Sequence, residues 1–104
     1  RMLLDTLVDV YAELLDQAGY HSVHIGKWHL QGHGEKGSAN FPEKHGFDIN
    51  VAGHNAGQPG SYYYPYQSER HAWSNVPDME DGAAGDYLTD ALTDKAIGFI
   101  EDHR

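Results

Sequence analysis

A lysine and a histidine stand two residues apart, at Lys27 and His29, directly after a short, partly β-branched run that ends at Gly26. If the chain stays extended there, both side chains point to the same side. A lysine supplies a compact positive charge with hydrogen-bond donors, and a histidine can donate a hydrogen bond or move a proton near neutral pH. Together they suit a tetrahedral oxyanion. Without further context, two solvated loop residues explain the same pattern.

An aromatic run at Tyr62–Tyr66, with Trp73 nearby, is a second candidate binding feature. These side chains combine an apolar ring with a polar tip, so they can stack on sugar rings. Ordinary packing over a neighbouring segment also explains the run, and we favour packing.

The histidines and the acidic residues are not spaced like a known metal site. The intervals between four histidines match no common zinc arrangement, and the chain has no cysteine: His29, His33, His45 and His54. Four acidic residues lack the alternating ligand order of an EF-hand loop: Asp78, Glu80, Asp81 and Asp86. We therefore predict no metal ligand in this chain and interpret the acidic stretch as a solvated loop.

A helix followed by a strand would position the lysine and the histidine. Apolar residues recur at spacings of three and four up to Ala18, which predicts a helix over residues 5–18 that ends before Gly19. Alternation over residues 21–26 predicts a short strand. A helix, a tight turn and a strand form an αβ unit, which favours a parallel sheet and an α/β fold.

Residues 30–86 are rich in Gly, Pro, Asn, Ser and His and are predicted to be mostly loop. Within them, residues 47–51 could form a second short strand. A final helix begins near Leu88, with Asp86 or Thr89 as its cap, and its apolar stripe continues to Ile100. A loop of this length inside a compact domain is unusual, so we expect it to be functional or to contact other segments.

Length and charge narrow the functional classes. The chain has 104 residues, which allows one domain at most, and a formal net charge of −9. This acidic balance argues against a nucleic-acid groove and against an anionic membrane surface. No apolar run approaches the roughly 18 residues that a membrane span needs. The lack of cysteine excludes disulfides here but does not fix the compartment.

Three blocks of the sequence resemble the type I sulfatases. Gly19–His29 meets every specified position of the family's pattern Gly-Tyr, one residue, Ser or Thr, two residues, a small or apolar residue, then Gly-Lys-aromatic-His. Pro42–Asp48 is similar to the family's Pro…Gly-Phe-Asp segment. Tyr87–Ile97 is similar to its Tyr-x-Thr-Asp…Thr-Asp-x-Ala-Ile helix. The blocks occur in family order and span about residues 11–102.

This resemblance implies a fold and three residue roles. The fold is an alkaline-phosphatase-like α/β sandwich, of which residues 1–104 would be an internal helix–strand–long loop–helix segment of the catalytic domain; both ends of the sequence look cut. Lys27 would bind the sulfate group, and His29 would hydrogen-bond the hydrated formylglycine nucleophile. His54, in a turn-rich loop after Gly-Phe-Asp, would contact the group that carries the sulfate, although a plain loop of turn formers is the simpler interpretation of that stretch.

The resemblance also implies parts that this segment does not contain. The family's nucleophile motif, Cys/Ser-x-Pro-x-Arg, is absent, and so are its Asp-rich ligands for Ca²⁺. We therefore expect the Ca²⁺ ligands and the formylglycine outside this segment, the remainder of the sulfatase domain as its partner, and no catalysis by the segment alone. The substrate would be a sulfate ester, with a carbohydrate sulfate as one option.

Two other functions fit the same residues. One is a piece of a related phosphate or phosphonate monoester hydrolase. The other, from a different class, is a small acidic module that binds a carbohydrate or a protein through its tyrosine-rich loop. The module should be a stable folded unit by itself, whereas a segment of a larger domain should have little stability of its own.

Overall fold

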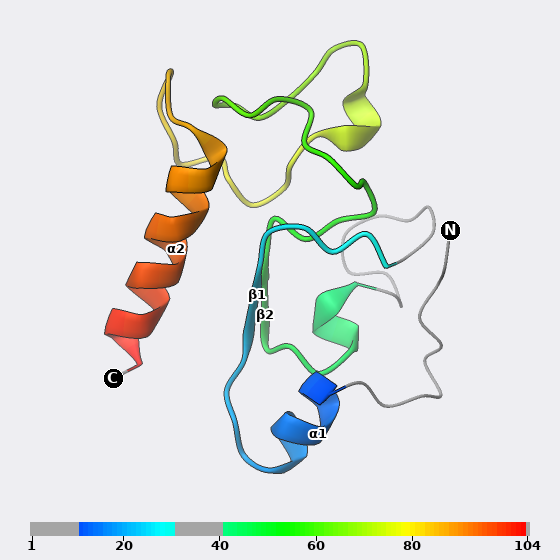
Figure 1. The fold of residues 1–104 in the computed structure, drawn as a ribbon, viewed down its shortest axis with the longest axis vertical. Coiled ribbons are helices and arrows are strands. Elements are labelled where there is room, and N and C mark those ends of the chain that lie inside the picture. The colour runs from blue at the N-terminus through cyan, green and yellow to red at the C-terminus, as the bar shows by residue number, and fades with distance from the viewer. Residues whose placement is uncertain (1–10, 31–40, 104) are drawn as a thin grey trace.

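The computed structural model describes residues 11–30 and 41–103 of the chain (Figure 1). In these ranges it contains, in chain order, α1 (Tyr11–Gln17), β1 (Val23–Ile25), the 3₁₀ helix η1 (Pro42–Lys44), β2 (Ile49–Val51), the 3₁₀ helix η2 (Ala72–Ser74) and α2 (Leu88–Asp102). The mixture of helices and strands confirms the α/β class. The predicted helix over residues 5–18 is confirmed for Tyr11–Gln17, while residues 5–10 lie outside the described ranges.

The two strands pair in parallel, as the helix–strand order predicted. Val23 is opposite Ile49 and Ile25 is opposite Val51, and the Gly26 N–H donates to the Val51 carbonyl at 2.9 Å. In a parallel pair the carboxyl ends lie at the same edge. The segments that follow β1 and β2 therefore leave the sheet side by side, which brings the Lys27 region next to the His54 region (Figure 1).

The turn between α1 and β1 follows the predicted glycine cap. Gly19 has a φ of +91°, in the left-handed region, and the Tyr20 N–H donates to the Leu15 carbonyl at 3.0 Å. This pattern closes the last turn of a helix and satisfies one of its terminal carbonyls.

The predicted cap of α2 is wrong. The cap position is Tyr87, not Asp86 or Thr89, and it makes no side-chain cap bond. Instead, the Leu88 N–H donates to the Tyr62 carbonyl at 2.8 Å, so a neighbouring backbone segment satisfies the helix start. The Asp86 carboxylate is engaged elsewhere, because it accepts a hydrogen bond from the Ala83 N–H at 2.8 Å.

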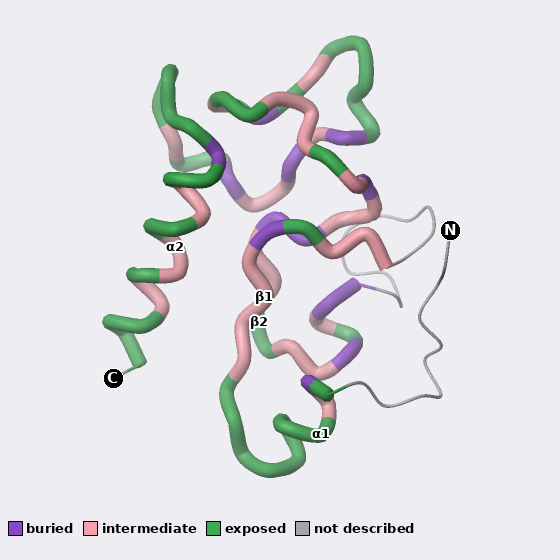
Figure 2. Tube along the Cα trace, viewed as in Figure 1, coloured by how far each residue is buried: buried purple, intermediate pink, exposed green. Residues whose placement is uncertain are grey.

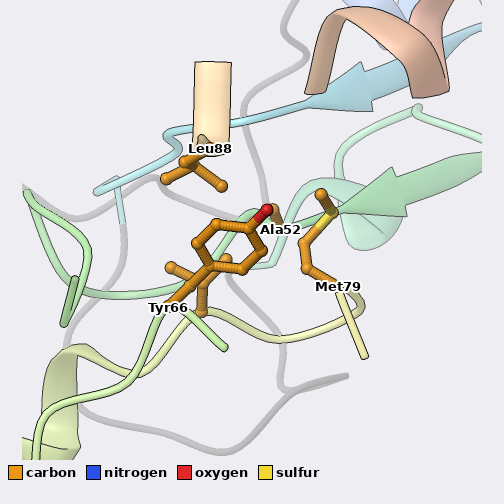
Figure 3. Close-up of a cluster of buried hydrophobic side chains, with 5 residues drawn as sticks. Ala52, Tyr66, Met79 and Leu88 are labelled. Carbon is orange, nitrogen blue, oxygen red and sulfur yellow. The ribbon is translucent and has the colours of Figure 1, made fainter. Parts of the chain in front are cut away.

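The main buried cluster lies beyond the carboxyl ends of the strands. Figure 3 shows Tyr66, which is fully buried, among Ala52, Met79 and Leu88. Buried residues gather where the long loop meets the strand ends and, in a second group, around η1 and Ala12, whereas the rest of α1 and the carboxyl-terminal half of α2 are exposed or half-buried (Figure 2). The core therefore supports the part of the molecule in which the candidate site residues lie.

Candidate functional site

Lys27 and His54 line the same cavity, which has a volume of about 310 Å³. It opens at the carboxyl end of the β1–β2 pair, between the loop after β2 and the first turns of α2. In open α/β sheets this is the edge at which ligands bind. The cavity is lined by Gly26, Lys27, Ala52, His54, Ala56, Gly57, Gln58, Pro59, Tyr62, Val76, Leu88, Thr89 and Leu92. Lys27 is exposed, so its ammonium group can reach a bound anion.

His29 does not continue the extended geometry that would place it beside Lys27. Its φ is +54°, in the left-handed region, so simple alternation does not set the direction of its side chain. Its N–H donates to the His54 carbonyl at 3.1 Å, and its ring lies against Gly57. The structure thus brings His29 to the loop that forms one wall of the cavity, although His29 itself is not one of the lining residues.

Trp28 packs away from the cavity, as expected for the residue between Lys27 and His29. Its ring meets those of His24 and Phe47 edge to face, at centroid distances of 5.2 and 6.1 Å. This aromatic packing anchors the segment after β1. It leaves the neighbouring lysine free to face solvent.

His24 fixes the backbone of Lys27. Its Nε2 lies 3.1 Å from the Lys27 carbonyl oxygen. Burial lowers the pKa of His24 below 6.5, and this hydrogen bond opposes the shift only in part. The ring is therefore neutral at neutral pH, and Nε2–H is the donor, because a carbonyl oxygen only accepts. Sequence reasoning placed His24 only within a short strand over residues 21–26 and missed this role.

The loop after β2 is braced by two side chains that sequence reasoning also missed. The Asn50 amide donates to the Gly53 carbonyl and accepts from the Gly53 N–H, both at 3.0 Å. The Asp78 carboxylate accepts from the Ala52 N–H at 3.2 Å. An Asn three residues before a Gly, at the end of a strand, is a typical turn signal. These bonds hold the start of the loop that carries His54 and Gly57.

His54 has one ring nitrogen in a hydrogen bond and one without a partner in the described part of the chain. Its Nδ1 lies 3.1 Å from the Ala52 carbonyl oxygen, so in the neutral ring Nδ1 carries the hydrogen. Its Nε2 is buried and has no hydrogen-bond partner in the described part of the chain. A neutral ring with this tautomer can accept a hydrogen bond at Nε2, for example from a hydroxyl group.

Comparison with known proteins identifies the family. The Sulfatase family pattern matches residues 8–104. The chain belongs to the sulfatase family. It is 36% identical over 93 residues to an N-acetylglucosamine-6-O-sulfatase of Bacteroides thetaiotaomicron, an alignment that covers 88% of this chain and 13% of that protein. It is 34% identical over 104 residues to an arylsulfatase of Hemicentrotus pulcherrimus, covering 88% of this chain and 18% of that protein.

The aromatic run of this sulfatase-family chain divides between packing and exposure. Tyr66 is fully buried in the main cluster, and the ring of Tyr64 meets it edge to face at 5.7 Å. Tyr62 is 54% exposed and lines the cavity with Lys27 and His54. Trp73 is exposed on η2 and contacts His71. Packing thus accounts for one end of the run, while Tyr62 belongs to the candidate site.

The described residues do not fit the metal that the sulfatase family implies. Within residues 11–30 and 41–103, no three His, Asp or Glu side chains gather closely enough to hold an ion. His33 lies outside these ranges. We therefore assign no residue of this segment to calcium and derive no step through it.

No helix in the described ranges is long and apolar enough to cross a bilayer.

Proposed function

We propose that this chain is an internal segment of a sulfatase catalytic domain and supplies one wall of the sulfate-ester site. The observation that carries the proposal is the placement of Lys27, directly after β1, at a cavity of about 310 Å³ that it shares with His54. Pockets of this size are large enough for a small ligand. Because the chain covers 13% and 18% of the two relatives, most of the domain lies outside it.

Lys27 binds the sulfate group in this proposal. A sulfate ester carries negative charge on its terminal oxygens, and this charge is redistributed as the S–O bond breaks. A positive group held next to those oxygens stabilises the transition state more strongly than it would in bulk water. The hydrogen bond between His24 and the Lys27 carbonyl, 3.1 Å long, fixes the backbone from which the ammonium group extends.

The two histidines have different tasks. His29 hydrogen-bonds the nucleophile, which another part of the domain supplies because this chain lacks the Cys/Ser-x-Pro-x-Arg motif that would provide it. His54 contacts the organic group that carries the sulfate, and its unpartnered Nε2 accepts a hydrogen bond from a hydroxyl of that group. The exposed ring of Tyr62 lines the same cavity and offers an apolar face to a sugar or an aryl ring.

The test is ester hydrolysis by the full-length protein. We expect turnover of 4-nitrophenyl sulfate or of N-acetylglucosamine 6-sulfate that exceeds turnover of 4-nitrophenyl phosphate. The two sulfates correspond to the two relatives, whose names specify an arylsulfatase and an N-acetylglucosamine-6-O-sulfatase. Faster hydrolysis of the phosphate would favour the monoester-phosphatase alternative. Binding of saccharides without hydrolysis of any ester would favour the carbohydrate-binding module.

A further inference from the structure

Gly57 lies against the His29 ring and also lines the cavity. A methyl group added to Gly57 would lie 2.7 Å from Nδ1 and 2.8 Å from Cε1 of His29. Such distances are well inside normal van der Waals contact. Gly57 also lines the cavity that contains Lys27 and His54. The backbone of this one residue therefore contacts both the imidazole and the site.

The need for glycine at this position is spatial and not conformational. Among the described glycines, those with a left-handed φ are Gly19, Gly26, Gly46 and Gly85, and Gly57 is not one of them. An alanine at position 57 would therefore not meet the strain of a left-handed φ. The obstacle to a side chain at this position is the His29 ring.

The backbone around Gly57 is poorly placed to move away. Its neighbour Ala56 is only 4% exposed, and the loop begins with the clamp between Asn50 and Gly53. The His29 N–H is bound to the His54 carbonyl in the same loop at 3.1 Å. The imidazole, a side chain that turns about two bonds, is the part that can give way. A methyl group at position 57 thus displaces the His29 ring by about 1 Å, the distance needed to restore normal contact.

We propose that Gly57 is a positioning residue, which seats the His29 imidazole at the edge of the cavity. This inference rests on the proposed role of His29 in sulfate-ester hydrolysis. It assigns Gly57 no contact with the reacting atoms. Gly57 acts through the ring that it supports, and its lack of a side chain is the property that matters.

The experiment is a double-mutant cycle in the full-length protein, with Gly57→Ala, His29→Ala and both together. Gly57→Ala should lower kcat/KM for the sulfate ester by about 10- to 100-fold, as expected for a catalytic group displaced by about 1 Å. It should also shift the pH profile of kcat/KM, because the surroundings of the imidazole change. Any loss of melting temperature caused by Gly57→Ala should disappear in the His29→Ala background, where the clash is absent.

Gly98→Ala is the matched control, because a methyl group at Gly98 meets nothing within 4 Å. It should leave kcat/KM unchanged. If Gly57→Ala keeps kcat/KM while His29→Ala removes it, the positioning role is wrong and the proposed function stands. If Gly57→Ala lowers the melting temperature equally in both backgrounds, Gly57 is structural and the inference also fails. If His29→Ala keeps full activity, the proposed role of His29 itself is wrong.

Discussion

At the scale of single residues, the site depends on hydrogen bonds that hold the backbone of the candidate residues. His24 donates to the Lys27 carbonyl, and the His54 carbonyl accepts from the His29 N–H. The backbone at Lys27 and at His29 is thus held by hydrogen bonds, while the exposed Lys27 side chain is left for a ligand. Such support is what allows a polar group to keep a productive geometry without reorganisation.

The first prediction concerns His24 and pH. Burial lowers the pKa of His24 below 6.5 in the folded protein, so the unfolded chain binds a proton more readily there. The contribution of neutral His24 to the free energy of unfolding is fully present above pH 6.5. It is lost as the pH falls from 6.5 through the lowered pKa. The melting temperature of the full-length protein should therefore fall less on acidification in His24→Gln. The exposed His71→Gln is the control. If the melting temperature falls with pH equally steeply in wild type and in His24→Gln, burial of the His24 ring does not affect stability.

At the scale of elements, pattern and spacing predicted the two strands, the two α-helices of the described ranges and the turn at Gly19, but neither the 3₁₀ helices nor the cap of α2. Gly19 could be recognised because a glycine that follows an apolar stripe is a local signal. The cap of α2 could not, since the Tyr62 carbonyl that accepts from Leu88 N–H is 26 residues away in the sequence. The direction of the His29 side chain was predicted wrongly for a similar reason. The backbone of His29 has a φ of +54° and contacts a loop that is distant in the sequence, and local alternation of residue types cannot indicate such a contact.

The loop after β2 supplies the second prediction. Asn50→Ala removes both hydrogen bonds to Gly53 and leaves partly buried polar groups without partners. The free energy of unfolding should fall by about 1 to 3 kcal/mol. Asn50→Asp keeps the acceptor for the Gly53 N–H and loses the donor, so it should be intermediate. Urea unfolding of the full-length protein measures both, and an unchanged midpoint in Asn50→Ala would show that this brace contributes nothing.

The third prediction concerns α2. Gly98 lies inside the helix with open space around its Cα. Gly98→Ala should raise the free energy of unfolding by about 0.5 to 1 kcal/mol, because alanine loses less backbone entropy in a helix. Thermal unfolding measures the change. A lower melting temperature would mean that another segment of the full-length protein packs directly on Gly98.

At the scale of the whole molecule, large apolar side chains of both α-helices are exposed in the described ranges. Its radius of gyration is 14.3 Å, against about 13 Å for a compact domain of this length. Leu14 and Ile100 are 55% and 65% exposed, although both belong to the predicted apolar stripes. The helices that carry these stripes are confirmed, but within the described ranges both residues stay exposed instead of packing into a core. This agrees with an internal segment of a larger domain.

The fourth prediction follows from that surface. The 104-residue chain expressed alone should self-associate and unfold without a cooperative transition, because the two α-helices and two short strands of its described ranges bury too little surface. Light scattering and urea unfolding measure these properties. A monodisperse monomer with a steep transition would favour the independent binding module.

The most direct test of the central claim is the kcat/KM of Lys27→Met for sulfate-ester hydrolysis by the full-length protein. Methionine keeps the length of the stem and removes the charge, so we expect a loss of about 100-fold or more. Lys44→Met, at an exposed lysine in η1, is the matched control and should keep wild-type activity. If Lys27→Met hydrolyses the sulfate ester as fast as wild type, Lys27 does not bind the sulfate group, and the site proposed for this cavity is wrong.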